Sequence, residues 1–338
     1  MKIIVDAMGG DNAPQSAVKG TLYARQRLGV DIVLVGRKED ISSCLEGCDT
    51  DGISIVDARE VVTMHDDPST ATRKKKDSSM TVALTMLKNG EGDAVVSAGS
   101  TGALLTGATL ITKRIKGIRR AAMAPVFPSM ESGFMLMDCG ANADCTPEYL
   151  LQFAYMGSFY AKRLMGISNP RVALLNNGAE ETKGGQLQQS AYKLLKAAKD
   201  EGHLNFVGNI EGSTMFMGGA DVVVTDGFSG NIALKTTEGA AKLLFKELKG
   251  VLKKNPINKF AAAILYKDIK SIAKKLDPNE VGGTPMLGIS RPVIKAHGSS
   301  RAKGIKNAIR QAKTCVEHDL CGTMQAALDA RGKGEQTV

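Results

Sequence analysis

The stretch VVVTDGFSGNIA at residues 222–233 holds the pattern that decides the fold. Its three consecutive valines lack the alternation of apolar and polar residues expected of a half-exposed strand. Continuous apolar runs of this kind are typical of strands covered on both faces. A polar turn with two glycines follows, and Ile232 opens a helical stretch. A strand, a glycine-containing turn and a helix in this order indicate one unit of an α/β fold.

The same unit recurs along the chain. Short β-branched or apolar runs end in glycine-rich turns and alternate with helical stretches, which predicts an α/β fold with a largely parallel sheet. We expect strands at residues 2–5, 31–35, 53–56, 93–97, 133–138, 171–175, 205–208 and 221–225. No low-complexity linker and no repeat of fixed period divides the 338 residues.

Polar, glycine-rich turns follow several of these runs. Parallel sheets bind their ligands beyond the carboxyl ends of the strands, so such turns are the first place to look for a site. The sequence predicts one composite cleft lined by residues 6–14, 97–102, 138–144, 176–185, 226–231 and 296–300.

The charge and the cysteines narrow the function classes. A net charge of +9 favours negatively charged partners, but no zinc-finger spacing or aromatic-studded basic strand supports nucleic acid. None of the six cysteines lies in a C-x-x-C pair, so we expect reduced thiols and no metal site. The chain starts MKIIVDAMGG without a leader pattern and has no apolar stretch of spanning length, which favours the cytoplasm.

Residues 251–276 differ in character from the rest. Asn255-Pro256 is typical of a helix start, and apolar residues, among them Phe260, Ile264 and Leu265, then follow at helical spacing. Seven lysines lie in the same segment. The residues alone leave two interpretations open: a surface helix packed on the core, or an amphipathic helix on an anionic membrane.

Two turns have residue types suited to an anion or to a developing negative charge. Residues 97–102 (SAGSTG) precede a helix, so their backbone N–H groups could bind an anion, although a turn that merely caps the helix is as common. In residues 226–231, Asn231 could donate to a carbonyl oxygen as it becomes negative. The alternative is that Asp226 and Asn231 only hold the loop backbone in place.

Two further side chains are candidates for chemistry. Lys183 follows a predicted strand and could face an incoming anion, but a solvated surface lysine is the alternative. His297, in KAHGSS, could act as a general acid, and a structural histidine capping a turn competes with that interpretation. Cys139 lacks a neighbouring base. The run Arg73 to Lys76 is either a solvated face or a dock for an acidic partner.

The joint order of eight segments resembles one known family over nearly the full length. They are VDAMGGDNAP (5–14), RKKKDSSM (73–80), SAGSTGA (97–103), DCGAN (138–142), YMGSFY (155–160), EETKGG (180–185), VVVTDGFSGN (222–231) and IKAHGSS (294–300). The sequence is similar to the bacterial acyl carrier protein:phosphate acyltransferases of phospholipid synthesis, the PlsX family.

The resemblance implies a fold and an activity. We expect one domain over residues 1–338, like isopropylmalate dehydrogenases and phosphotransacetylases, with two α/β lobes around a cleft, a protruding amphipathic helix and a homodimeric assembly. The implied activity moves a long-chain acyl group from acyl carrier protein to inorganic phosphate, without a cofactor. A cytoplasmic protein bound peripherally to anionic membrane through residues 251–276 is also implied.

The resemblance also assigns the site. The catalytic residues would be Lys183, Asn231 and His297, and Phe260, Ile264 and Leu265 would contact the membrane. Phosphate and substrate would lie against Asp6, Gly9, Gly10, Ser100, Thr101, Gly102, Asn142, Asp226, Ser229, Gly230 and Ser299.

Chemistry suggests how these residues would share the work. Lys183 and the backbone of residues 100–102 would hold phosphate, Asn231 would steady the oxyanion, and His297 or Lys183 would attend the leaving sulfur. Because phosphate is itself the nucleophile, no covalent enzyme intermediate is required. Two rivals remain at this point: a short-chain acyl-coenzyme A phosphotransacetylase and a noncatalytic membrane scaffold.

Overall fold

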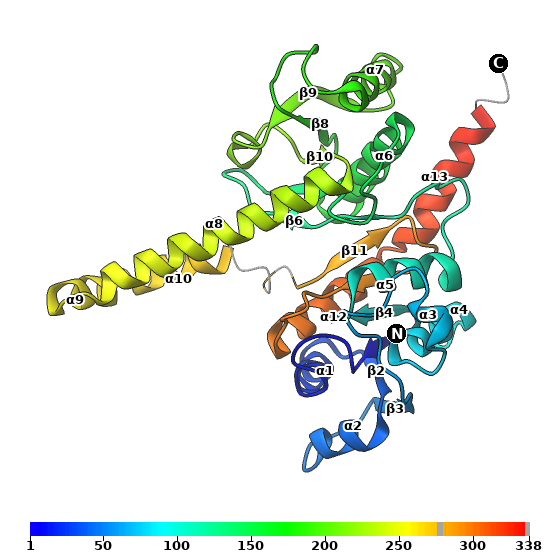
Figure 1. The fold of residues 1–338 in the computed structure, drawn as a ribbon, viewed down its shortest axis with the longest axis vertical. Coiled ribbons are helices and arrows are strands. Elements are labelled where there is room, and N and C mark those ends of the chain that lie inside the picture. Colours follow the sequence, from blue (N-terminus) through cyan, green and yellow to red (C-terminus); the bar gives the residue numbers. More distant parts are fainter. Residues whose placement is uncertain (276–279, 281, 335–338) are drawn as a thin grey trace.

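The computed structural model describes residues 1–275, 280 and 282–334, with side chains up to residue 329. Its strands form two separate sheets (Figure 1). The first sheet has the order β3-β2-β1-β4-β12-β11-β5, and the segment from β3 to β12 is parallel. Its strands are β1 (Lys2–Asp6), β2 (Asp31–Gly36), β3 (Ile53–Asp57), β4 (Ala94–Ser97), β5 (Ala122–Met123), β11 (Thr284–Leu287) and β12 (Val293–Lys295).

Helices cover both faces of this first sheet. One layer contains α1 (Gln15–Leu28) packed against α12 (Ala302–Glu317), so closely that a Cβ on Gly20 would lie 2.6 Å from the Cβ of Ile305. The remaining helices of this lobe are α2 (Lys38–Leu45), α3 (Ala71–Lys74), α4 (Ser79–Asn89), α5 (Thr101–Gly107), η1 (Ala108–Thr112) and α13 (Leu320–Gly334).

The second sheet has five strands in the order β6-β7-β10-β8-β9. They are β6 (Val126–Phe127), β7 (Phe134–Met137), β8 (Arg171–Asn176), β9 (Asn205–Glu211) and β10 (Val222–Val224). Its accompanying helices are α6 (Pro147–Leu164), α7 (Gln186–Asp200) and η2 (Met215–Met217). The three valines of β10 are fully buried in the centre of this sheet, as their continuous apolar run predicts.

The predicted α/β class and its parallel strands are confirmed. Sequence reasoning missed the short antiparallel strands β5, β6 and β11, because two to four residues are too few to show a periodicity. It also missed β12, whose apolar run ends in the buried Lys295.

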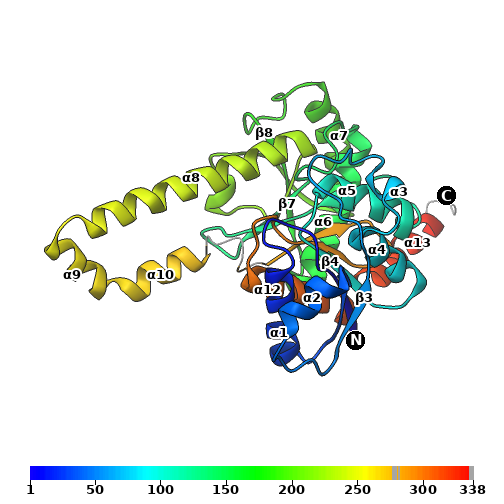
Figure 2. The same ribbon diagram turned by 60° about the horizontal axis from the view of Figure 1, so that its bottom comes forward.

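A helical hairpin extends from the second lobe. Figures 1 and 2 show α8 (Gly227–Lys253) projecting from the body, with α9 (Pro256–Ile264) at its far end and α10 (Tyr266–Lys275) running back. The expected helix start at Asn255 is confirmed, since its Oδ1 accepts from Asn258 N at 2.8 Å. The helical part is much longer than the predicted segment 251–276, whose last residue, Leu276, lies outside the described residues.

None of the helices described here combines the length and the low charge needed to cross a bilayer.

The start of α8 is seated on the second sheet through glycines. Asp226 caps the helix by accepting from Ser229 N at 2.8 Å, and Gly227 N donates to the carbonyl of Asn142 at 2.7 Å. Gly230 passes so close to the backbone of Asp138 that a Cβ would lie 1.9 Å from its carbonyl oxygen. The direction of the whole hairpin therefore depends on a residue without a side chain at position 230.

We expect Gly230→Ala to lower the free energy of unfolding by about 2–3 kcal/mol, because the added methyl group forces α8 away from Asp138. Gly239→Ala is the matched control: it lies on the same helix, where a Cβ would meet nothing within 4 Å. That variant should gain about 0.5–1 kcal/mol from better helix propensity. Urea unfolding measures both, and equal stability of the two variants would contradict the proposed seating.

Candidate active site

Three turns meet at the carboxyl edge of the first sheet. The turn after β1 joins the turn after β12, where Asp11 N donates to Gly298 O at 2.9 Å. It also lies on the turn after β4, since a Cβ on Gly9 would be 2.7 Å from Gly99 N. Gly10 has a φ of +98° and faces Gly298 O. Close backbone approach thus explains the glycines at positions 9 and 10.

Asp6 is buried beneath these turns. Its Oδ2 accepts from Ser97 Oγ at 2.6 Å, and its Oδ1 accepts from Met8 N at 3.2 Å. Burial raises the pKa of the carboxyl group, while hydrogen bonds from Ser79 and Ser97 oppose the rise. Asp6, expected among the substrate-binding residues, therefore orders the turns on which a substrate would lie.

Lys295 is the residue of this edge that sequence reasoning missed. Lys295 is the last residue of β12, and its side chain is buried. Its Nζ donates to the carbonyls of Ala98 and Ala296. Burial lowers the pKa of the amine to about 8. The negative charge of Asp6 opposes this decrease, and the positive charge of Lys235 adds to it. The available signal was a lysine that directly continues an apolar strand, since buried lysines are rare.

Asp138 organises the opposite side of the cleft, at the carboxyl ends of the second sheet. Its carboxylate accepts from Met123 N at 2.9 Å, Asn142 N at 2.7 Å and Asn142 Nδ2 at 2.9 Å. Burial raises its pKa, and these hydrogen bonds oppose the rise. Asn142, Asp226, Ser229 and Gly230 therefore build the start of α8, and their expected contacts with substrate stay a prediction.

One face of α8 carries a polar stripe of Asn231, Lys235, Glu238 and Lys242, spaced four, three and four residues apart. His297 of the first lobe meets this stripe, with Nε2 at 3.8 Å from Glu238 Oε1. Asn231 lies two turns nearer the helix start, about 10 Å along the axis. His297 thus lies beside the helix that carries Asn231, and the catalytic roles of both residues stay predictions.

The His297 ring is held by its own turn. Ser299 N donates to Nδ1 at 3.2 Å, and Ser299 Oγ lies 2.9 Å from the same nitrogen. Burial lowers the pKa of the imidazole, Glu238 opposes this, and Lys235 adds to it. Ser299, expected to bind substrate, therefore also orients His297.

Lys183, the third predicted catalytic residue, lies in the loop between β8 and α7. Its side chain is half exposed, and its Nζ is 4.0 Å from Glu180 Oε2. In the part of the chain that the structure describes, its polar contacts stay within this loop and do not reach Asn231 or His297. Its catalytic role stays a prediction.

An open pocket of about 480 Å³ connects the Lys183 loop to the start of α8. It is lined by Asp144, Cys145, Gln186, Leu187, Asp226 and Phe228. Phe228 is 63% exposed, which leaves a large apolar surface along a pocket that also has polar lining residues. The pocket therefore has room for a ligand with both apolar and polar parts.

Residues 100–102 begin α5 at the first-lobe side of the cleft. Ser100 is buried, and its side chain makes no capping hydrogen bond to the helix. A Cβ on Gly102 would lie 2.9 Å from Pro68, so this glycine lets the loop after β3 approach α5. Whether Ser100 and Thr101 bind phosphate stays a prediction.

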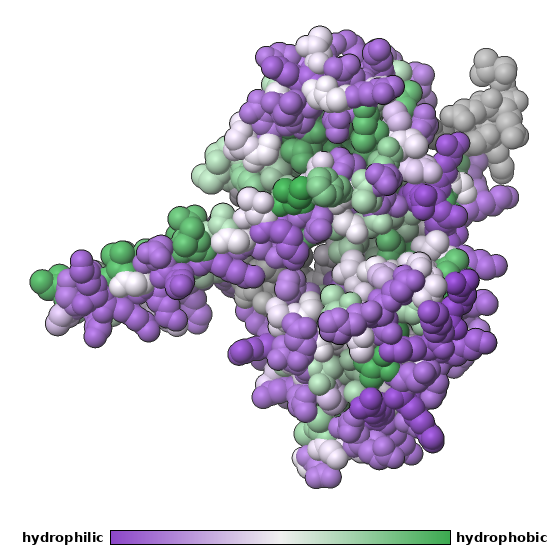
Figure 3. Space-filling model, in the orientation of Figure 1, coloured by the Kyte–Doolittle hydropathy of each residue, from purple (hydrophilic) through white to green (hydrophobic). Residues whose placement is uncertain are grey.

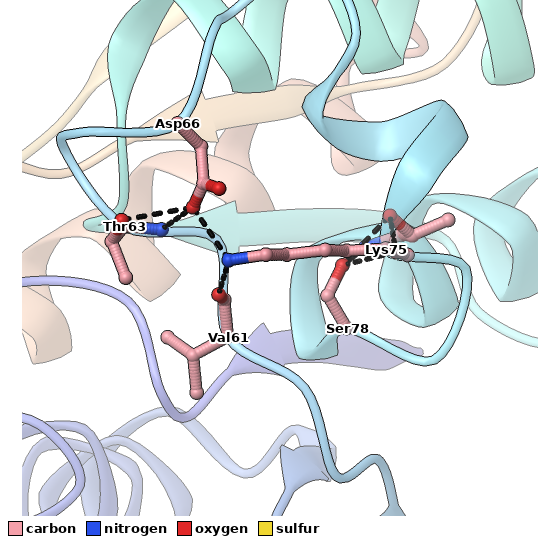
Figure 4. A network of polar contacts seen from close by, with 6 residues as sticks. Val61, Thr63, Asp66, Lys75 and Ser78 are labelled. Carbon is pink, nitrogen blue, oxygen red and sulfur yellow. Dashed lines mark hydrogen bonds and ion pairs between the residues drawn. The ribbon is translucent and has the colours of Figure 1, made fainter.

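A partly buried ion pair between Lys75 and Asp66 holds the loop after β3 in place (Figure 4). Lys75 Nζ donates to Asp66 Oδ2 at 2.7 Å and to Val61 O at 2.8 Å, while Thr63 N donates to the same Asp66 oxygen at 2.7 Å. These hydrogen bonds, with that of Lys75 the largest, lower the pKa of Asp66 to about 2. Lys75 therefore differs from its exposed neighbours in the basic run, Arg73, Lys74 and Lys76.

Among the described residues, no group of three or more His, Cys, Asp or Glu side chains is arranged to hold a metal ion.

The fold belongs to the phosphotransacetylase-like class. A phosphotransacetylase from Streptococcus pyogenes matches with a TM-score of 0.61 and 18% identity, covering 95% of this chain and 94% of that one. One from Staphylococcus aureus matches with a TM-score of 0.59 and 16% identity, covering 93% and 94%. These likenesses confirm the expected fold class.

The family follows from sequence. The model of the family described as fatty acid synthesis protein matches residues 1–323. A phosphate acyltransferase from Thermoanaerobacterium thermosaccharolyticum is 47% identical over 332 residues, which cover 98% of each chain. The chain belongs to this family, which confirms the resemblance carried by its motifs.

The lowered pKa of Lys295 predicts the direction in which stability changes with pH. Because the folded-state value of about 8 lies below the ordinary 10.5, the unfolded chain holds one more proton between these values. Stability conferred by this position therefore rises with pH across that range. From pH 7.5 to 10, wild type should gain about 2 kcal/mol of unfolding free energy relative to Lys295→Met. Urea unfolding at both pH values measures this gain. If the difference in unfolding free energy between wild type and Lys295→Met does not change with pH, the pKa of the amine is not lowered.

Proposed function

We propose that this chain transfers a long-chain fatty acyl group from acyl carrier protein to inorganic phosphate, giving an acyl phosphate for phospholipid synthesis. Membership of the family supports an acyltransferase with phosphate as acceptor. The observation that carries the proposal is the meeting of His297 with the α8 stripe that starts at Asn231. It places an acid beside several lysines, on a helix that also carries an amide donor.

In the proposed reaction a phosphate oxygen attacks the thioester carbonyl carbon, and the carbon–sulfur bond breaks. The proton of HPO4²⁻ is balanced by the proton that the departing thiolate takes up, so that acyl phosphate and a free carrier thiol result. Asn231 donates to the carbonyl oxygen as it becomes negative. As the imidazolium, His297 donates its Nε2–H to the leaving sulfur and becomes neutral, and the proton that phosphate releases restores the imidazolium.

Phosphate would bind between the lobes. Lys183 would contribute its ammonium group from the second lobe, and residues 100–102 would contribute backbone N–H groups from the first. The pocket at Phe228 would receive the thioester end of the acyl group, whose apolar chain suits that exposed ring.

The acyl donor would dock at exposed basic residues. Arg73, Lys74 and Lys76 are exposed, whereas Lys75 is engaged with Asp66 (Figure 4). This group lies next to the loop that touches α5 through Pro68 and Gly102. An acidic carrier protein fits such a surface, and the net charge of +9 speeds its approach.

The helical hairpin supports a peripheral membrane location for a cytoplasmic enzyme. Ile257, Phe260 and Ile264 are 80%, 71% and 67% exposed and lie on one face of α9. Lysines accompany them, and Figure 3 has hydrophobic residues along the hairpin next to hydrophilic ones. Apolar residues flanked by lysines suit the boundary of an anionic bilayer.

The homodimer that we propose would use another part of the hairpin. Leu243, Leu244 and Leu248 of α8 are 60%, 70% and 40% exposed, nearer the body than α9. A second copy pairing its own α8 there would bury these leucines.

The central test is the reaction itself. Purified protein with palmitoyl-acyl carrier protein and phosphate should release free carrier thiol and form acyl phosphate in equal amounts. Lys183→Ala should lower the rate at least about a hundredfold, because phosphate loses its cation. Lys193→Ala removes the same charge from an exposed position on α7 and should leave the rate unchanged.

Two outcomes would contradict the proposed donor. Activity with acetyl-coenzyme A and none with long-chain carriers would assign a short-chain phosphotransacetylase, which the fold likeness also allows. No acyl phosphate from any donor would favour a membrane scaffold.

Membrane binding has its own test. Ile264→Asp/Leu265→Asp should weaken sedimentation with phosphatidylglycerol vesicles at least about tenfold, because both exposed side chains lose apolar burial. Met130→Asp is the control, since Met130 is 79% exposed but outside the hairpin. Activity in solution should stay unchanged, and undiminished vesicle binding would rule out these residues as the contact.

A further inference from the structure

The contact between His297 and Glu238 joins the two lobes. His297 follows β12 of the first sheet, whereas Glu238 lies on the fourth turn of α8, which starts from the second sheet. The Glu238 side chain is only 12% exposed, whereas that of His297 is 40% exposed. A carboxylate with little exposure, that of Glu238, thus faces the proposed acid His297.

The ring nitrogen that faces Glu238 carries the proton. In the neutral ring Nδ1 presents a lone pair to Ser299 N–H, whereas in the imidazolium Nδ1–H can donate to Ser299 Oγ, 2.9 Å away. In the neutral imidazole the proton then resides on Nε2. Nε2 lies 3.8 Å from Glu238 Oε1, beyond hydrogen-bond range but within that of an ion pair. The Glu238 carboxylate therefore attracts the N–H edge electrostatically without accepting a hydrogen bond from it.

Glu238 is itself fixed. Its Oε2 accepts from Lys235 Nζ at 2.9 Å, one turn earlier on α8. The helix α8 thus holds the carboxylate from one side while the first lobe brings His297 to the other. The relation between the two depends on the seating of α8 at Gly230, not on flexible side chains alone.

Charges of both signs act on the imidazole. Glu238 favours its protonated form, while Lys235 and Lys242 of α8 and Lys295 of β12 disfavour it, in addition to burial. Asp11 of the turn after β1 lies beside Gly298, its Oδ1 3.8 Å from where a Cβ would be. Glu238 is the carboxylate placed at the Nε2 edge of the ring.

We propose that Glu238 is a positioning residue, which draws the Nε2–H edge of His297 toward the polar face of α8 and sustains its ability to hold a proton for the departing sulfur. This rests on the proposed function, in which His297 serves the leaving group. Glu238 touches no reacting atom and acts through the imidazole. Lys235 limits the effect by sharing the carboxylate.

The direct test is the titration of His297 followed by NMR of the imidazole. A His297→Gln variant assigns the signal among the four histidines. Glu238→Gln should lower the titration midpoint of His297 by about 0.5 or more, because an opposite charge nearby is lost. Lys235→Met should raise it, and Glu238→Asp should restore part of the wild-type value.

Kinetics give the second readout. Glu238→Gln should lower kcat for acyl phosphate formation about tenfold or more with little change in KM for phosphate, and shift the His297-dependent limb of the pH profile to lower pH. Glu247→Gln is the matched control, since it removes the same charge from an exposed position further along α8. It should change neither quantity.

The outcomes separate this proposal from the function on which it rests. Loss of activity in Glu238→Gln with an unmoved His297 titration would mean a merely structural role and overturn it, as would unchanged activity and titration. Because the NMR measurement needs no substrate, the predicted opposite shifts can be found even if wild type forms no acyl phosphate. That combination would refute the function while retaining the contact.

Discussion

The buried carboxylate of Asp138 is the constraint on which the rest depends. It follows β7 of the second sheet yet accepts from Met123 N, which belongs to β5 of the first, and so ties the two lobes together. Its other hydrogen bonds order Asn142, whose carbonyl in turn receives Gly227 N at the start of α8. A buried charge is tolerated only when it is hydrogen-bonded in this way. One carboxylate thus fixes the lobes and the helix that serves both.

The helix α8 links the chemistry to the surface. Its first turns carry Lys235 and Glu238 toward His297, and its later turns carry the hairpin away from the body. A small rotation of α8 would therefore change the candidate site and the exposed apolar face together. The close approach of Gly230 to Asp138 limits that rotation, because neither backbone can give way cheaply.

Local patterns were enough for the strands, the turns and the family. The apolar run before Asp226 and the turn containing Asn231 are contiguous, so they could be found without knowing any long-range contact. The site was harder. Lys295 looked like one of many lysines, and only burial against Ala98 distinguishes it. Glu238 lay in an ordinary helical stretch, and its importance comes from His297, fifty-nine residues away in the chain.

The sequence by itself determined the α/β class, the carboxyl-end turns, the helix start at Asn255 and membership of the family, because each depends on residues close together in the chain or on the order of motifs. The tertiary structure decided that the strands form two sheets, that Lys75 turns inward to Asp66 and that His297 meets α8. These depend on distances between remote segments, which are set by packing and by the burial of charge, and no local pattern encodes them.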